Sequence, residues 1–142
     1  MKNLVIRPFQ ETNRDEVVKL WTFCSLIVPQ NDPHRDIDRK VRVNSDGFLI
    51  GNLADKVVAT CMVGYDGHRG WINYLAVHPD QQRRGFATQI MAEAVCFLDQ
   101  SGCPKINLQV RAMNTQVIAF YESLGFSRDN VISLGKRLIP DH

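Results

Sequence analysis

Apolar residues recur at two different spacings along the chain, and each change of spacing marks the boundary of an expected strand or helix. Residues 4–7 predict a short apolar strand that Pro8 ends. A helix is expected to begin at Thr12, because Asp15 lies three positions further on as a capping partner. Its apolar residues recur every three or four positions and predict one buried face: Val17, Leu20, Trp21 and Cys24.

The next segment alternates between loop, helix and strand. Two prolines and an Asn-Asp pair predict a loop at residues 29–33. Residues 36–43 carry alternating charges and few apolar side chains, which predicts a short helix on the surface. Residues 48–52 and 56–65 predict two paired strands.

A strand, a helix and a second strand form the central unit of the chain. An Asp-Gly pair at residues 66–67 predicts a turn into a strand at residues 71–77. The following helix extends to about Ser101, and Gly102 ends it. Residues 105–111 predict the next strand. The helix carries a clear apolar stripe: Ile90, Met91, Ala94, Val95 and Leu98.

A helix at residues 114–124, ended by Gly125, begins the C-terminal part of the chain. Strands are expected around Phe126 and at residues 131–139. Strands and helices are therefore mixed, with antiparallel hairpins at both ends of the central unit. We expect a single α/β domain that spans residues 1–142.

Composition narrows the functional classes. The 142 residues are 44% hydrophobic and carry 17 basic against 15 acidic side chains, a net charge of +2. This balance does not favour binding to nucleic acid or membrane, and no apolar run has transmembrane length. The four cysteines lie far apart without metal-ligand spacing, so we expect no metal site and a cytoplasmic protein with reduced thiols.

The segment between the strand at 71–77 and the following helix carries candidate chemistry. Gln82, Gly85 and Ala87 fit a Gln/Arg-x-x-Gly-x-Gly/Ala pattern at the first turn of that helix, and Arg83 and Arg84 add positive charge. The first turn of a helix has free N–H groups and favours an anion, so the pattern suits a phosphate or pyrophosphate. Small residues at such a turn can also serve only to pack strand against helix.

A second segment favours the phosphate-binding interpretation of the turn over the packing interpretation. Downstream of the turn, the chain shows an Asn-x6-Tyr-x3-Gly-Phe pattern from Asn114 to Phe126. The two patterns together resemble the GNAT superfamily of acetyl-CoA-dependent N-acetyltransferases over nearly the whole chain. Residues 31–33, 64–70 and 134–138 resemble the bacterial YpeA subgroup of that superfamily.

The resemblance implies a GNAT fold with four main helices and a mixed central sheet opened by a V-shaped splay. It implies acetyl-CoA as co-substrate, without a metal. The strand end would bind the pantetheine arm through the backbone of Leu75, Ala76 and Val77. The turn would seat the pyrophosphate through residues that follow one another in the chain: Gln82, Arg83, Arg84, Gly85, Phe86, Ala87 and Thr88.

Tyr121 is the candidate catalytic side chain. It lies seven residues after Asn114, so both project from one face of the expected helix. In the family this tyrosine is the usual general acid for the thiolate, and the asparagine caps the helix and can bind the cofactor. A tyrosine whose ring simply packs in the core is the alternative.

The general base is unassigned. In the related ribosomal-protein alanine N-acetyltransferases a Glu stands where this chain has Gln109, and an amide cannot usefully accept a proton at neutral pH. Asp66, His68, Tyr74 and an ordered water remain as candidates.

The family resemblance places the acceptor amine at the first two helices and their loop, residues 21–38, facing the turn at residues 66–69. Trp21 could pack on the body of the acceptor, and Asp32, Asp66 and His68 could bind it. Asp36 and Asp38 more readily serve as caps or surface acids. The acceptor is either a small molecule or a protein terminus, and a homodimer is possible.

Two hypotheses of different classes follow. The first is an N-acetyltransferase that acts by direct attack in a ternary complex. The second is a non-catalytic acyl-CoA sensor or interaction module on the same fold, suggested by Gln109 in place of the Glu. A nucleotide-binding βαβ fragment is disfavoured, because the first strand is not followed by a Gly-rich turn.

Overall fold

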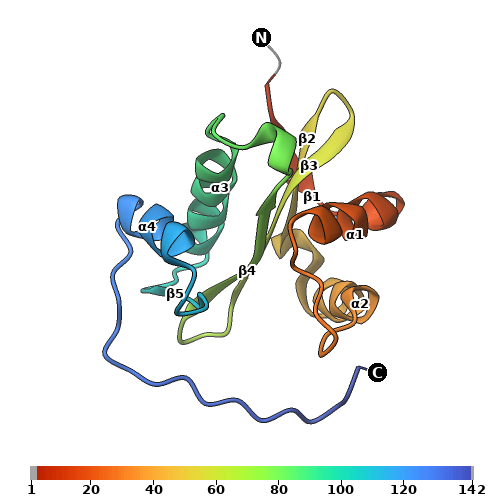
Figure 1. The fold of residues 1–142 in the computed structure, drawn as a ribbon. Coiled ribbons are helices and arrows are strands. Elements are labelled where there is room, and N and C mark those ends of the chain that lie inside the picture. Colours follow the sequence, from red (N-terminus) through yellow and green to blue (C-terminus); the bar gives the residue numbers. More distant parts are fainter. Residues whose placement is uncertain (1–2, 142) are drawn as a thin grey trace.

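The computed structural model describes residues 3–141, and its centre is a five-stranded sheet in the order β1-β2-β3-β4-β5 (Figure 1). The strands are β1 (Val5–Pro8), β2 (Phe48–Leu53), β3 (Lys56–Tyr65), β4 (Gly70–Val77) and β5 (Ile106–Leu108). The helices are α1 (Arg14–Phe23), α2 (Pro33–Asn44), α3 (Phe86–Gln100) and α4 (Thr115–Ser123). The mixed α/β fold with four main helices is confirmed.

Two helices cover each face of the sheet, α1 and α2 on one side and α3 and α4 on the other (Figure 1). Each pair builds its own core. The stripe of α3 packs on one face through Ile90, Met91, Ala94 and Leu98, all buried, with Tyr121 of α4 in the same cluster. Val17, Leu20 and Trp21 of α1 and Ile37 of α2 pack on the other face. None of the helices within residues 3–141 is long and apolar enough to cross a membrane.

The sheet opens between β4 and β5. Strands β1 to β4 pair antiparallel, whereas β4 and β5 pair parallel over only three residue pairs, from Gly70 with Ile106 to Ile72 with Leu108. Beyond Ile72, β4 continues to Val77 without a partner on the β5 side among the described residues. This divergence is the V-shaped splay that the sequence predicted.

A β-bulge lies in β4 at the start of the divergence. The register between β3 and β4 shifts between Thr60 and Met62, so Tyr74 and Leu75 together oppose Cys61. Tyr74 has a φ of 51°, a left-handed conformation that is uncommon for a bulky residue. Such bulges bend a strand and increase its twist, which turns the end of β4 away from β5.

Four contacts hold the bulge on the α1 and α2 side. The rings of Trp21 and Tyr74 stack with centroids 3.8 Å apart. The Trp21 Nε1–H donates to Thr60 Oγ1 (3.0 Å), and the Thr60 hydroxyl donates to the Tyr74 carbonyl (2.8 Å). The Tyr74 hydroxyl donates to Asp36 Oδ2 at 2.6 Å. The neighbouring structure thus determines an otherwise unfavourable backbone conformation.

The starts of the first two helices differ from the prediction. Helix α1 begins at Arg14 after a 3₁₀ turn (Glu11–Asn13), and the Gln10 N–H donates to Asn13 Oδ1 (2.9 Å). Capping by Thr12 and Asp15 was therefore wrong. Helix α2 begins earlier than expected, because Pro33 suits the first helical position and Asp32 caps the helix.

The C-terminal prediction was also wrong. Residues 127–141 contain no strand or helix, and the chain runs from α4 past the sheet to α2 (Figure 1, blue). Strand β5 is also shorter than the predicted 105–111. Two side-chain contacts link the extended segment to the residues around β5, Lys105 with Asp129 (2.9 Å) and Gln109 with Ser133. Side-chain contacts of this kind do not build a strand ladder.

We predict that Trp21→Ala destabilises the fold by roughly 3–5 kcal/mol, because it removes a fully buried ring and its support of the bulge. Chemical denaturation followed by circular dichroism measures this free energy of unfolding. Phe23→Ala is the matched control, since Phe23 lies on the same helix with 58% of its surface exposed, and it should cost about 1 kcal/mol or less. Equal losses in the two variants would contradict the account of the bulge.

Candidate active site

The open edge of β4 presents its backbone to the space that β5 leaves. The His78 N–H donates to the Val58 carbonyl (2.8 Å), so at His78 the backbone points toward β3. Because backbone groups of successive residues point to opposite sides of a strand, those of Val77 and Leu75 point away from β3. A ligand that lies along this edge can therefore form strand-like hydrogen bonds with the backbone of Leu75 and with the Val77 N–H, whereas the Val77 carbonyl already accepts from Gln82 and Cys24.

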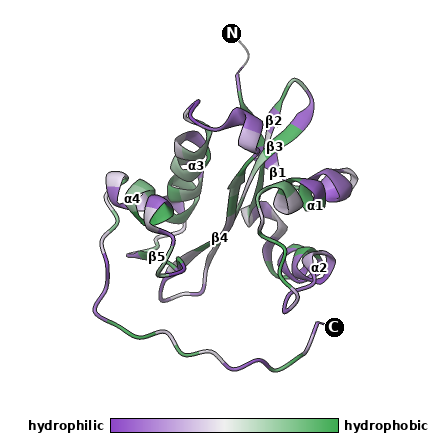
Figure 2. Cartoon of the chain, in the orientation of Figure 1, coloured by the Kyte–Doolittle hydropathy of each residue, from purple (hydrophilic) through white to green (hydrophobic). Residues whose placement is uncertain are grey.

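The turn between β4 and α3 provides a second set of backbone donors and is largely hydrophilic (Figure 2). Gly85 is the N-cap residue with a φ of 79°, and Arg83 also has a positive φ, 65°. The first bond of α3 runs from the Gln89 N–H to the Gly85 carbonyl, and no side chain caps the helix. The N–H groups of the first helical turn are therefore available to an anion.

Gly85 is needed for its conformation. A Cβ built at this position has no atom within 4 Å, so the described chain leaves open space there. Its positive φ is the left-handed conformation that glycine adopts without steric cost. The open space beside the uncapped turn is the place that a bound anion would occupy.

The side chains of the turn contribute unequally. Arg84 donates to Gln81 Oε1 and lies over the Phe86 ring, 5.3 Å from its centroid. The Gln82 amide donates to the Val77 carbonyl (3.2 Å) and ties the turn to the end of β4. Arg83 and Thr88 are exposed, and Ala87 is half-buried. Arg84 is exposed too, so both turn arginines keep a charge that faces solvent, and only Arg84 is held by neighbouring side chains.

Tyr121 lies in the core on the α3 and α4 side. Its ring is buried and meets Phe120 and Phe126 edge-on, with centroids 5.3 and 5.6 Å apart. Burial raises the pKa of the Tyr121 phenol above its ordinary value, and the Cys61 thiol adds to this effect. The phenol therefore stays protonated at neutral pH, as a proton donor must be.

Asn114 occupies the N-cap of α4, as predicted. Its Oδ1 accepts from the Val117 N–H at 3.4 Å, and the residue is exposed. The side-chain amide of Asn114 therefore remains accessible to a ligand beside the helix.

The candidate general bases differ in how readily they could accept a proton. Asp66 accepts hydrogen bonds from the N–H groups of Arg69 and His68, and these bonds lower its pKa. Burial raises the pKa of Tyr74, whose hydroxyl donates to Asp36, so its phenolate is disfavoured. Gln109 is exposed and donates to Ser133. His68 lies exposed in the turn after β3, and an ordered water remains a further candidate.

Two of the residues expected to contact the acceptor are engaged in structural contacts. Trp21 has no exposed surface, so its ring cannot reach an acceptor in this structure and belongs to the core. Asp32 caps α2 by accepting from the N–H groups of His34 and Arg35. Pattern alone could not reveal the Trp21 contact, because the partners of a buried ring depend on the tertiary fold.

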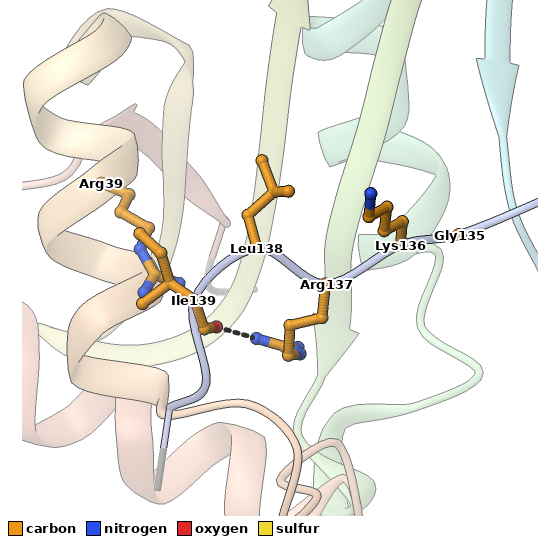
Figure 3. A pocket seen from close by; sticks show the side chains of 6 residues that line it. All are labelled: Arg39, Gly135, Lys136, Arg137, Leu138 and Ile139. Carbon is orange, nitrogen blue, oxygen red and sulfur yellow. Dashed lines mark hydrogen bonds between the residues drawn. The ribbon is translucent and has the colours of Figure 1, made fainter.

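A cavity that the sequence did not reveal lies between α2 and the C-terminal segment (Figure 3). Its volume is about 570 Å³. Its lining residue Arg39 donates to Asp36 (3.4 Å), which also accepts from the Tyr74 hydroxyl. The lining residues are Arg39, Gly135, Lys136, Arg137, Leu138 and Ile139.

A splayed strand edge beside an uncapped helix turn is consistent with the GNAT fold, and sequence comparison shows the family. Residues 10–126 match the model of the acetyltransferase (GNAT) family. The chain therefore belongs to the GNAT acetyltransferase family, and it is an enzyme. This membership favours the catalytic hypothesis over the sensor.

Curated relatives are similar over almost their whole length. A protein named acetyltransferase from Sodalis glossinidius is 47% identical over 137 residues, which are 96% of each chain. Another from Yersinia enterocolitica is 45% identical over 136 residues, again 96% of each chain.

Solved structures share the fold at low sequence identity. The ribosomal-protein-S18-alanine N-acetyltransferase of Escherichia coli matches with a TM-score of 0.77 at 20% identity, over 90% of this chain and 80% of that one. The PaiA N-acetyltransferase of Thermoplasma acidophilum, solved with coenzyme A, matches with a TM-score of 0.77 at 14% identity, over 92% and 93%. An aminoglycoside N-acetyltransferase in complex with CoA matches with a TM-score of 0.73 at 18% identity, over 97% of each chain.

Proposed function

We propose that this enzyme transfers the acetyl group of acetyl-CoA to a primary amine, by direct attack in a ternary complex. The observation that carries the proposal is the open edge of β4 beside the uncapped first turn of α3. Coenzyme A needs this combination, because its pantetheine arm carries amides and its pyrophosphate carries negative charge. Solved structures with the same fold include complexes with coenzyme A.

The cofactor would lie across both elements. Its pyrophosphate accepts hydrogen bonds from the N–H groups at Gly85 to Thr88, and Arg83 adds positive charge. Its pantetheine amides pair with the backbone at Leu75 and Val77. Asn114 lies exposed at the start of α4 and can bind the cofactor from that side.

The transfer itself needs one proton donor and one neutral amine. The amine nitrogen attacks the thioester carbonyl carbon, and backbone N–H groups of β4 stabilise the developing oxyanion. The C–S bond then breaks, and the thiolate takes the proton of the Tyr121 hydroxyl. The nitrogen loses its proton to water, and solvent reprotonates Tyr121. The acceptor is a small molecule or a protein terminus.

Gly85→Glu should abolish binding of coenzyme A, because a carboxylate placed in the open space of the turn repels the pyrophosphate. Isothermal titration calorimetry with coenzyme A measures this loss. Gly102→Glu is the matched control, since Gly102 also has a positive φ (78°) and open space but lies at the far end of α3. Unchanged affinity in a folded Gly85→Glu protein would remove the basis of the proposal.

Tyr121→Phe should lower kcat by roughly tenfold to a thousandfold, because the thiolate loses its proton donor. Affinity for coenzyme A should stay nearly constant, since the ring still fills its place in the core. Turnover is followed by thiol release from acetyl-CoA with an amine panel, or by slow hydrolysis if no acceptor is found. A variant as active as the parent would reduce Tyr121 to a packing residue.

The pH dependence tests the absence of a dedicated base. If water takes the proton, kcat/KM should rise with pH toward the pKa of the acceptor amine, because only the free base attacks. Gln109→Glu should shift this rise to lower pH if the new carboxylate reaches the amine or its water. A flat profile between about pH 6 and 9 would instead indicate a base of lower pKa, and His68 would be the first residue to replace.

A further inference from the structure

The cavity between α2 and the C-terminal segment is positively charged. Three of its six lining residues, Arg39, Lys136 and Arg137, are basic and none is acidic. Figure 3 shows Arg39 reaching in from α2 and the other two on the segment that crosses it. The rest of the lining is Gly135 and two largely exposed apolar side chains, Leu138 and Ile139.

Two of these three cations form no direct ion pair among the described residues, although the charge of Arg137 helps to lower the pKa of Asp141. The Arg39 guanidinium pairs with Asp141 at 2.7 Å, which neutralises it and ties the C-terminal segment to α2. Arg137 donates only to neutral oxygens, the Ile139 carbonyl (3.1 Å) and Asn31 Oδ1. Among residues 3–141, neither Arg137 nor Lys136 forms an ion pair. A guanidinium held by two neutral acceptors keeps further N–H donors for an incoming anion.

The four acids that the sequence offered for binding a cationic acceptor are already engaged. Asp36 accepts from Tyr74 and Arg39, and Asp38 pairs with Arg14 at 2.6 Å. Asp32 caps α2, and Asp66 accepts from two backbone N–H groups and the Trp71 indole. The basic cavity would therefore repel a purely cationic acceptor such as a polyamine. The four carboxylates that could attract it already have partners.

We infer that the acceptor of the proposed acetyl transfer carries a carboxylate in addition to its amine. The inference rests on the proposed function and names its substrate class, an amino carboxylate. The carboxylate would bind the Arg137 guanidinium, and Lys136, which Figure 3 shows on the other side of the segment, would add positive charge. The amine would extend along α2 toward the bulge, where the Tyr74 hydroxyl donates to Asp36 beside Arg39. An arginine guanidinium can donate two parallel N–H bonds to the two oxygens of one carboxylate, which a lysine cannot do.

The experiment compares amines that differ only in the carboxylate. The panel contains an α-, a β- and a γ-amino acid, each with its primary amide, together with a diamine and an aminoglycoside. Each kcat/KM is corrected for the fraction of free base. We expect the best amino carboxylate to exceed its amide by roughly tenfold or more, the range of hydrogen bonds to charged groups.

Variants of the basic residues test whether the cavity causes the preference for the carboxylate over the amide. Arg137→Gln should raise KM for the carboxylate acceptor, leave kcat nearly constant, and bring the ratio of carboxylate to amide toward one. Lys136→Gln should act in the same direction. Arg42→Gln is the matched control, because it removes one exposed positive charge from α2 outside the cavity lining and should leave the ratio unchanged.

Two different failures can be told apart. If the amides, the diamine or the aminoglycoside react better than the amino carboxylates, or if Arg137→Gln leaves the ratio unchanged, the inference is wrong and acetyl transfer still stands. If coenzyme A binds but no acceptor of any class consumes acetyl-CoA, the proposed function fails together with the inference. Calorimetry with coenzyme A on each variant shows that the cofactor site is intact.

Discussion

The loss of pairing between β4 and β5 after Ile72 is the constraint on which the site depends. A fully paired sheet would satisfy the backbone of Leu75 and Val77 internally and leave nothing for a ligand. The bulge at Tyr74 turns β4 away from its neighbour, and the contacts of Trp21, Thr60 and Asp36 hold that bulge in place. The core formed with α1 and α2 therefore keeps the end of β4 unpaired on the β5 side.

The groups proposed to take part in the reaction lie on different faces of the sheet. On the face covered by α3 and α4 lie the uncapped helix turn and the protonated phenol of Tyr121. On the face covered by α1 and α2 lie the bulge support and the basic cavity. Because Tyr74 and Leu75 are neighbours in β4 and pack into different cores, the two faces meet at the bulge.

Much of this arrangement follows from local pattern. The stripe of α3 depends on residues close together in the sequence, and spacing predicts it except at Val95, which is exposed. The turn at Gly85 and the cap at Asn114 are also local, and there the family resemblance completed the prediction. The register shift at Tyr74 and the burial of Trp21 depend on contacts between distant segments, which periodicity cannot specify. Residues 131–139 were predicted as a strand, but a strand also needs a paired neighbour, and two side-chain contacts link the segment to the residues that flank β5.

Parts of the site that depend on contacts between distant residues could not be predicted from the sequence. Asp36 looks like a surface acid in sequence, and only the fold shows that it links Tyr74 to Arg39. The basic cavity joins residues about a hundred positions apart, which the anchoring of Asp141 on α2 brings together. No motif marks such a pair. The residues proposed to bind coenzyme A can thus be predicted from sequence far better than those proposed to bind the acceptor.

The central claim is that coenzyme A binds the open edge of β4 and the first turn of α3. Amide hydrogen exchange, resolved by residue with NMR, tests it most directly, because bound N–H groups exchange slowly. We predict that coenzyme A slows exchange at Leu75, Val77 and the residues from Phe86 to Thr88, and leaves the antiparallel strands β1 and β2 unchanged. Unchanged exchange at these five amides in the presence of bound coenzyme A would contradict the account.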